Sequence, residues 1–182
     1  MKTISEHVLD IVQNSVRACA TLIEIIVIEN KSGDLYTLTI KDNGCGMSRE
    51  VLEKAANPFF TSRKTRKVGL GLSLLRQNAE AAKGSFCISS MPGMGTEVKA
   101  SFQLTHIDRP PAGDIWNSWY LTVIGNPDIR IIYRHHTQDG EYEIDSGEVR
   151  KMMKGVSLQR AEIGQAIIEL IKNNLEEIKA GK

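Results

Sequence analysis

Three polar side chains near the N-terminus are spaced so that a helix would carry them on one side. Asp10, Asn14 and Arg17 stand four and three residues apart, which places them in a single stripe opposite an apolar face. A carboxylate, an amide and a guanidinium in a row can act as a base, a metal ligand and a phosphate clamp. A solvated helix face whose side chains only pair with one another is the alternative interpretation.

A second candidate element combines an acid with two glycines. Asp42 ends an expected strand at 35–42 and is followed by Gly44 and Gly46. A fixed acceptor beside glycines would let a ligand approach the backbone closely. The alternative is a plain tight turn, of which Asp-Asn-Gly is also typical.

Paired glycines occur in two further segments. The segment GLGL (69–72) opens an expected helix over 68–84, and backbone N–H groups at a helix N-terminus favour anions. In GMGTEV (93–98), Thr96 begins an expected strand. The sequence contains no Gly-x-x-x-x-Gly-Lys-Ser/Thr motif, which excludes a Walker-type phosphate loop.

Apolar spacing and turn residues predict the elements that would position these groups. Helices are expected at 5–18, 48–56 and 68–84, and strands at 21–29, 35–42, 85–90 and 96–104. This order predicts an α+β two-layer sandwich, with the helices on one face of a mixed β-sheet and a domain over residues 1–106. Residues 107–113, with two prolines and a glycine, are the expected linker.

The remaining residues, 114–182, are expected to form a small α+β domain. It would contain a β-meander with strands at 119–124, 129–135 and 141–144, followed by a helix at 158–178. The sequence does not indicate the role of this part.

Composition limits the classes of function. The chain has 182 residues, a net charge of +1 and three scattered cysteines, so neither a global field for nucleic acid nor a disulfide framework is expected. No apolar run approaches the roughly 20 residues that span a bilayer, and the first residues do not suit a signal peptide. We therefore predict a cytoplasmic protein.

Together, the four segments resemble the boxes of the Bergerat-fold ATPases, the superfamily of DNA gyrase, Hsp90, sensor histidine kinases and MutL. The N-box resembles DIVQNSVRA (10–18), the two glycine boxes resemble DNGCGM (42–47) and GLGL (69–72), and the last box resembles GMGT (93–96). PFFTSRK (58–64) is similar to the segment that leads into the ATP lid of histidine kinases. The motif style is closest to histidine-kinase-like catalytic domains, and the resemblance ends near residue 104, leaving a C-terminal extension outside it.

The resemblance implies ATP and Mg²⁺ as cofactors. Asp10 would be the catalytic base, Asn14 the Mg²⁺ ligand, and Asp42 the acceptor that selects adenine. The other residues implied to bind ATP are Arg17, Gly44, Gly46, Met47, Gly69, Leu70, Gly71, Leu72 and Thr96. The basic residues Arg63, Lys64, Arg66 and Lys67 would reach the γ-phosphate or form a solvated loop. His7 is expected on the helix surface or in a supporting position rather than as a phosphoacceptor.

The function implied is a histidine-kinase-like ATPase or protein kinase component. It would transfer the γ-phosphate to a partner protein or to water in signal transduction. A non-catalytic ATP-gated interaction module and a MutL-like DNA-associated ATPase are the alternatives. We expect a protein partner, with neither a membrane nor a nucleic acid as partner, and a homodimer stays open.

Overall fold

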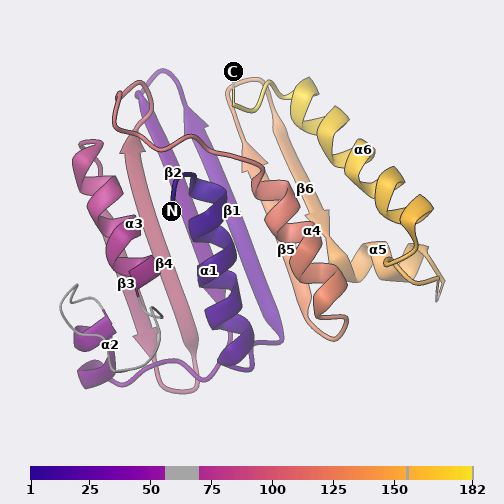
Figure 1. Cartoon of the computed structure of the whole chain (residues 1–182), viewed down its shortest axis with the longest axis horizontal. Helices are drawn as coiled ribbons and strands as arrows, with labels where there is room; N and C mark the ends of the chain where they lie inside the picture. The colour runs from indigo at the N-terminus through magenta and orange to yellow at the C-terminus, as the bar shows by residue number, and fades with distance from the viewer. Residues whose placement is uncertain (56–69, 155, 182) are drawn as a thin grey trace.

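The computed structural model describes residues 1–55, 70–154 and 156–181. Among the helices in these ranges, none combines the length and the apolar character needed to cross a bilayer. Along the chain, the elements are α1 (Ile4–Arg17), β1 (Leu22–Asn30), β2 (Leu35–Asp42), α2 (Arg49–Ala55), α3 (Leu70–Ala81), β3 (Phe86–Met91), β4 (Gly95–Gln103), α4 (Ile115–Gly125), β5 (Arg130–His136), β6 (Glu141–Asp145), α5 (Ser146–Met152) and α6 (Ala161–Glu177) (Figure 1).

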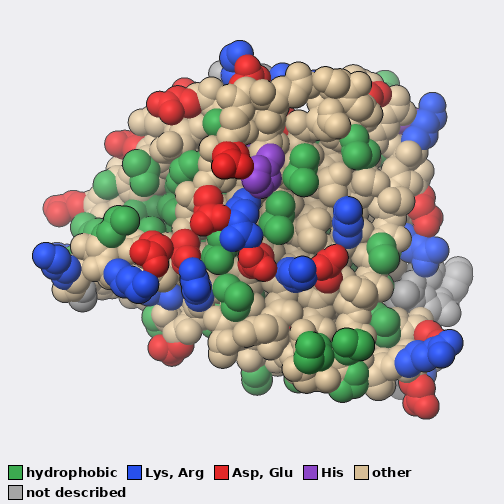
Figure 2. Space-filling view, turned by 180° about the vertical axis from the view of Figure 1, so that it is seen from behind, with side chains coloured by type: hydrophobic (Ala, Val, Ile, Leu, Met, Phe, Trp, Pro, Cys, Tyr) green, Lys and Arg blue, Asp and Glu red, His purple; other side chains and the backbone are tan. Residues whose placement is uncertain are grey.

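Six strands form one mixed sheet in the order β3-β4-β2-β1-β5-β6. β1 and β5 pair in parallel, whereas the other neighbours pair antiparallel. Figure 1 shows α1, α3 and α4 in front of the sheet, and Figure 2 shows charged side chains of both signs on the side seen from behind. The predicted α+β two-layer fold, with helices on a mixed sheet, is confirmed.

Helix α1 presents the polar stripe. It begins after Thr3, whose hydroxyl accepts a hydrogen bond from the Glu6 backbone N–H at 3.3 Å and caps the first turn. Its buried residues are Ile4, His7, Val8, Ile11, Val12 and Ser15. Because this face packs against the rest of the protein, the exposed side chains of Asn14 and Arg17 are left on the other side.

The prediction of a strand at 119–124 is wrong, because these residues lie in α4. The apolar, partly β-branched run favours a strand by residue type. However, the buried residues Ile115, Trp119 and Val123 follow one another at helical spacing. The indole N–H of the fully buried Trp119 donates to the Ile131 carbonyl at 2.9 Å. This hydrogen bond fixes α4 against β5, so the predicted meander is replaced by a helix and two strands.

Strands β5 and β6 extend the sheet that β1 to β4 form. Ile23 of β1 lies opposite Ile131 of β5 in the parallel pair. The expected linker also contacts the start of the chain, since the backbone N–H of Ile4 donates to the Pro111 carbonyl at 2.9 Å. The helix expected at 158–178 corresponds to α6. That residues 114–182 act as a domain of their own stays a prediction.

Candidate functional site

A cavity of about 290 Å³ lies where α1 meets the ends of β2, β3 and β4. The residues from the predicted set that line it are Asn14, Asp42, Gly46, Met47, Leu72 and Thr96. Apolar side chains, among them Ile11, Ile40 and Val98, form the rest of the wall. The fold therefore brings residues from distant segments around one mostly apolar space with a single carboxylate.

Asp42 is held by three hydrogen bonds. Its Oδ1 accepts the backbone N–H of Gly44 at 2.9 Å and that of Thr96 at 3.2 Å. Its Oδ2 accepts the Ser15 hydroxyl at 2.6 Å. Donors from α1, from the turn after β2 and from β4 thus fix the orientation of the carboxylate before any ligand binds.

Ser15 is a site residue that the sequence analysis missed. It is 2% exposed and lies on the buried side of α1, although its neighbour Asn14 is exposed. A small hydroxyl residue four positions after the buried Ile11 is the one sequence signal that could have identified it.

Ser90 is the second missed residue, and it joins two of the predicted segments. Its hydroxyl accepts the Met47 backbone N–H at 2.8 Å, donates to the Gly95 carbonyl at 2.9 Å and lies 2.9 Å from the Thr96 hydroxyl. Ser90 stands directly opposite Thr96 in the β3–β4 pair. Its role depends on strand pairing, for which the sequence carries no local signal.

Two of the glycines are explained by contacts within the protein. Gly46 has a φ of +66°, and a Cβ atom there would lie 1.9 Å from the Met91 carbonyl oxygen. A Cβ atom on Gly44 would lie 2.7 Å from the Ala18 carbonyl oxygen. Both residues therefore allow the turn after β2 to approach other backbone segments. Close approach of a ligand to them stays a prediction.

The polar stripe on α1 makes two contacts beside the cavity. The half-buried Asp10 lies against the start of α3, because a Cβ atom on Gly71 would be 1.9 Å from Asp10 Oδ2. The Arg17 guanidinium donates to Asn14 Oδ1 at 3.1 Å. The structure thus brings Asp10 to the helix that follows the second glycine box, while Arg17, which is not among the lining residues, pairs with Asn14 of the cavity wall.

Residues 2–106 match the family described as histidine kinase-, DNA gyrase B-, and HSP90-like ATPase. The chain belongs to this family. The Bergerat-fold resemblance is therefore confirmed, and the match contains the N-box, both glycine boxes and the last box.

Two curated relatives each match more than half of the chain. A protein of Shewanella frigidimarina whose name describes it as a sensor is 37% identical over 102 residues, which are 55% of this chain and 16% of that protein. The cell-division control histidine kinase PdhS of Brucella ovis is 31% identical over an alignment of 121 residues, and the alignment covers 58% of this chain and 12% of the kinase. The chain therefore spans less than a fifth of the length of either relative.

Solved structures show the same fold. The MutL ATPase domain of Aquifex aeolicus, complexed with ADP, has a TM-score of 0.51 at 16% identity and covers 85% of this chain and 70% of that one. The N-terminal domain of a DNA repair protein has a TM-score of 0.51 at 18% identity, with coverages of 79% and 52%. Residues 2–106 alone cannot supply 85% of this chain, so the likeness in fold includes part of the segment after 106.

Several predicted ATPase-site residues lie outside the described residues. They are Gly69 and the basic residues Arg63, Lys64, Arg66 and Lys67, together with the segment 58–64. Leu70 begins α3 with its backbone described but not its side chain. The predicted phosphate contacts of this segment stay predictions.

Of the two positions expected for His7, the helix surface is wrong. It is fully buried, and its Nε2 lies 3.0 Å from the Asn78 side-chain amide nitrogen on α3. Burial lowers the pKa of His7, so its imidazole is neutral at pH 7. The residue therefore joins α1 to α3, in a supporting position close to the contact between Asp10 and Gly71.

Proposed function

We propose that this chain binds ATP with Mg²⁺ in the cavity of about 290 Å³ and promotes transfer of the γ-phosphate to a partner protein or to water in signal transduction. The observation that carries the proposal is the fixed Asp42 carboxylate in an apolar cavity. An oriented carboxylate with free lone pairs can accept the exocyclic amino group of adenine, whereas guanine presents a carbonyl oxygen at that position. The apolar walls would contact the faces of the purine, with Met47 on one side.

The phosphates would extend from this cavity towards the start of α3. Backbone N–H groups of Gly69, Leu70, Gly71 and Leu72 are the proposed donors, since the first residues of a helix have N–H groups without a partner in the helix. Arg17 would add a positive charge beside Asn14. Two findings support this placement. The ATPase family matches residues 2–106, and a MutL ATPase domain of the same fold was solved with ADP.

The donors near this site suit Mg²⁺. Asn14 Oδ1 is a hard oxygen donor, and Mg²⁺ takes oxygen ligands that include substrate phosphates and waters. In the part of the chain that the structure describes, no group of three or more His, Cys, Asp and Glu residues forms a metal cage. Asn14 would hold the ion, which would neutralise charge on the phosphates when bound.

Asp10 is the proposed base. It would take the proton from the attacking hydroxyl or water as the new bond to phosphorus forms and the bond to ADP breaks. Its carboxylate lies against Gly71, which is the end of the site where the γ-phosphate would lie. The same contact also favours a second function, an ATP-gated interaction module, because a carboxylate engaged at the start of α3 can act as a latch that ATP displaces.

The test is an incubation with γ-labelled ATP and Mg²⁺, with and without cell extract, for the parent chain, for Asp10→Asn and for the control Glu53→Gln on the exposed side of α2. We expect released phosphate or a labelled partner with the parent and the control. Asp10→Asn should lose turnover by at least a hundredfold and retain ATP affinity. ATP binding without turnover in every chain would favour the gated module, and turnover that survives in Asp10→Asn would refute Asp10 as the base.

A protein partner, a homodimer and a cytoplasmic location remain part of the proposal. The histidine kinase relative supports the signalling assignment. The likeness to MutL and to a DNA repair protein supports a DNA-associated ATPase instead, although the net charge of +1 does not favour DNA binding. Turnover stimulated by duplex DNA but not by extract proteins would select that alternative.

A further inference from the structure

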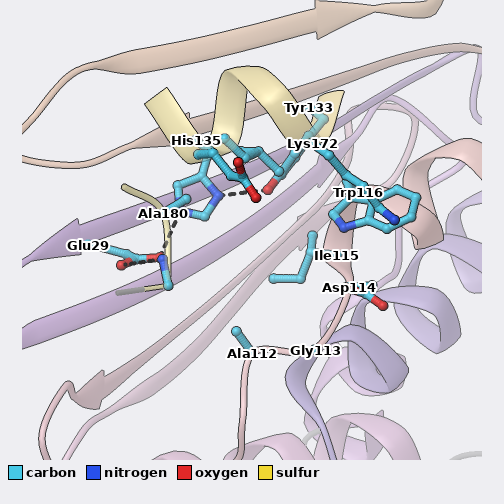
Figure 3. Close-up of a pocket in the computed structure, with 13 residues that line it drawn as sticks. Glu29, Ala112, Gly113, Asp114, Ile115, Trp116, Tyr133, His135, Lys172 and Ala180 are labelled. Atoms are coloured by element: carbon cyan, nitrogen blue, oxygen red, sulfur yellow. Dashed lines mark hydrogen bonds and ion pairs between the residues drawn. The ribbon is translucent and has the colours of Figure 1, made fainter. Parts of the chain in front are cut away.

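A second cavity, of about 400 Å³, lies at the other end of the sheet from Asp42. Its walls come from residues 112–116 before and within α4, from the C-terminal half of α6 and from β1 and β5 (Figure 3). Asp42 pairs with Ile23 and Tyr36 pairs with Glu29, so six positions of β2, about 20 Å, separate the two cavities. The proposed ATP chemistry uses none of the residues that line this second cavity.

A buried chain of hydrogen bonds connects three side chains on this cavity's wall. His135 lies 2.8 Å from Glu29 Oε1 through its Nε2 and 2.7 Å from the Tyr133 hydroxyl through its Nδ1. All three residues are at most 5% exposed. Buried polar groups of this kind are costly unless each is paired, and here the imidazole holds both neighbours in fixed orientations.

The Glu29 carboxylate has acceptor capacity left at Oε2. Oε1 accepts from His135 and from the Gly181 backbone N–H at 2.9 Å, whereas Oε2 accepts only the longer contact from the same N–H, at 3.1 Å. A carboxylate oxygen can accept two hydrogen bonds. Figure 3 shows Ala180 beside this carboxylate, at the edge of the cavity. The Gly181 N–H, which follows Ala180, is the donor there, and Oε2 keeps a lone pair for one further donor.

The Trp116 ring on the cavity wall already contacts a cation. The Lys172 ammonium lies 5.0 Å from the centre of the Trp116 ring, within the range of a cation–π interaction. Lys172 is the only Lys or Arg on the described lining, which also contains Glu29, Asp114 and Glu176. The three carboxylates on this lining outnumber its one Lys, and the charge of Arg109 nearby offsets part of this excess, so an ammonium is favoured over an anion in the cavity.

We propose that this cavity binds a small organic ammonium compound with an aromatic or apolar body. The ammonium would donate to Glu29 Oε2, and the aromatic or apolar body would extend along the cavity to the face of Trp116, in place of the Lys172 side chain. The apolar body would pack against Ile115 and Leu175, both of which line the cavity. A volume of about 400 Å³ falls within the range of small-molecule sites. This site is independent of the ATP proposal.

The test uses three probes that share one ring and differ in charge. Benzylammonium, benzyl alcohol and benzoate are titrated into the full chain at constant ionic strength, and binding is followed by calorimetry and by the NMR signal of the tryptophan indoles. We expect benzylammonium to bind at least tenfold more tightly than benzyl alcohol, and benzoate not to bind. The titration is then repeated with saturating ATP, which should leave the affinity unchanged.

Three variants separate the contacts. Lys172→Met should raise the affinity for benzylammonium severalfold, because it removes the competing cation, and a misfolded chain could not produce that gain. Trp116→Leu should lower the affinity at least fivefold, and the control Glu169→Gln, on the exposed side of α6, should not change it. Equal affinities for the three probes, a preference for benzoate, or no gain in Lys172→Met would each overturn the proposal.

Discussion

The hydrogen bond from Ser15 to Asp42 yields a prediction in two parts, one for stability and one for nucleotide affinity. Ser15→Ala removes a donor 2.6 Å from an ionised carboxylate. A hydrogen bond to a charged group contributes about 2 kcal/mol, and alanine regains about 0.5 kcal/mol of helix propensity. We therefore expect a net loss of about 1.5 kcal/mol in the free energy of unfolding, which for a chain of this size lowers Tm by about 5 °C.

The matched control is Ser118→Ala in α4. Ser118 is also a buried helical serine, but its hydroxyl donates to the neutral Ser5 carbonyl at 3.0 Å. A neutral hydrogen bond contributes about 1 kcal/mol, so the net loss after the same propensity gain is about 0.5 kcal/mol. The decrease in Tm should then be about a third of that of Ser15→Ala.

Nucleotide affinity separates the two variants further. Without Ser15, the Asp42 carboxylate keeps only its two backbone donors and must be ordered on binding, at a cost of about 1 kcal/mol. The affinity for ATP should therefore fall about fivefold in Ser15→Ala and stay unchanged in Ser118→Ala, as measured by calorimetric titration. Equal losses of affinity in both variants, or equal melting temperatures for Ser15→Ala and the parent, would refute the reasoning about Asp42.

Two further perturbations test other parts of the fold. Gly46→Ala places a methyl group where the Met91 carbonyl oxygen already lies, at a φ of +66°. Urea titration should therefore show a decrease of at least about 2 kcal/mol in the free energy of unfolding, and adenosine binding should be lost as well. Full stability in this variant would contradict the described turn. Burial is the largest single influence and raises the pKa of the Glu29 carboxyl, but the hydrogen bonds from His135 and the Gly181 N–H, together with the charges of His135 and Arg109, outweigh it and hold the pKa below its ordinary value of 4.5. Ionised Glu29 therefore stabilises the fold above pH 4.5, and this contribution is lost as the pH falls below 4.5 through the native pKa. The free energy of unfolding, measured from pH 6 to pH 3, should fall less steeply in Glu29→Gln than in the parent.

The elements up to residue 104 could be predicted from the sequence because each carries a local signal. The apolar side of α1 follows a helical period, and the segments that became β1 and β2 contain alternating or β-branched apolar residues between turns. The four boxes then predicted the family and, through it, a set of candidate site residues. Asn14, Asp42, Met47 and Thr96 do line one cavity, although no contact in the structure assigns them a ligand.

What the sequence could not supply depends on contacts between distant segments. Ser90 becomes a site residue only because β3 pairs with β4 in the register that places it opposite Thr96. The residues of α4 favour a strand by type, and their helix is fixed by the Trp119 contact with β5. The parallel pairing of β5 with β1 joins residues about a hundred positions apart, and this pairing creates the second cavity beside Glu29.

The two ends of the candidate ATP site are built differently: hydrogen bonds from three elements fix Asp42, whereas the start of α3 packs against α1. The proposed adenine end consists of Asp42 and its three donors, which belong to α1, β4 and the turn after β2. The proposed phosphate end depends on the start of α3, against which Asp10 lies, and His7 joins α1 to a later turn of α3 at Asn78. An anion bound near Gly71 would lie close to the Asp10 carboxylate, whose Oδ2 faces that residue, and the two negative charges would repel each other. Under the proposed function, phosphate binding would therefore act on the proposed base, whereas the Asp42 carboxylate already has fixed donors.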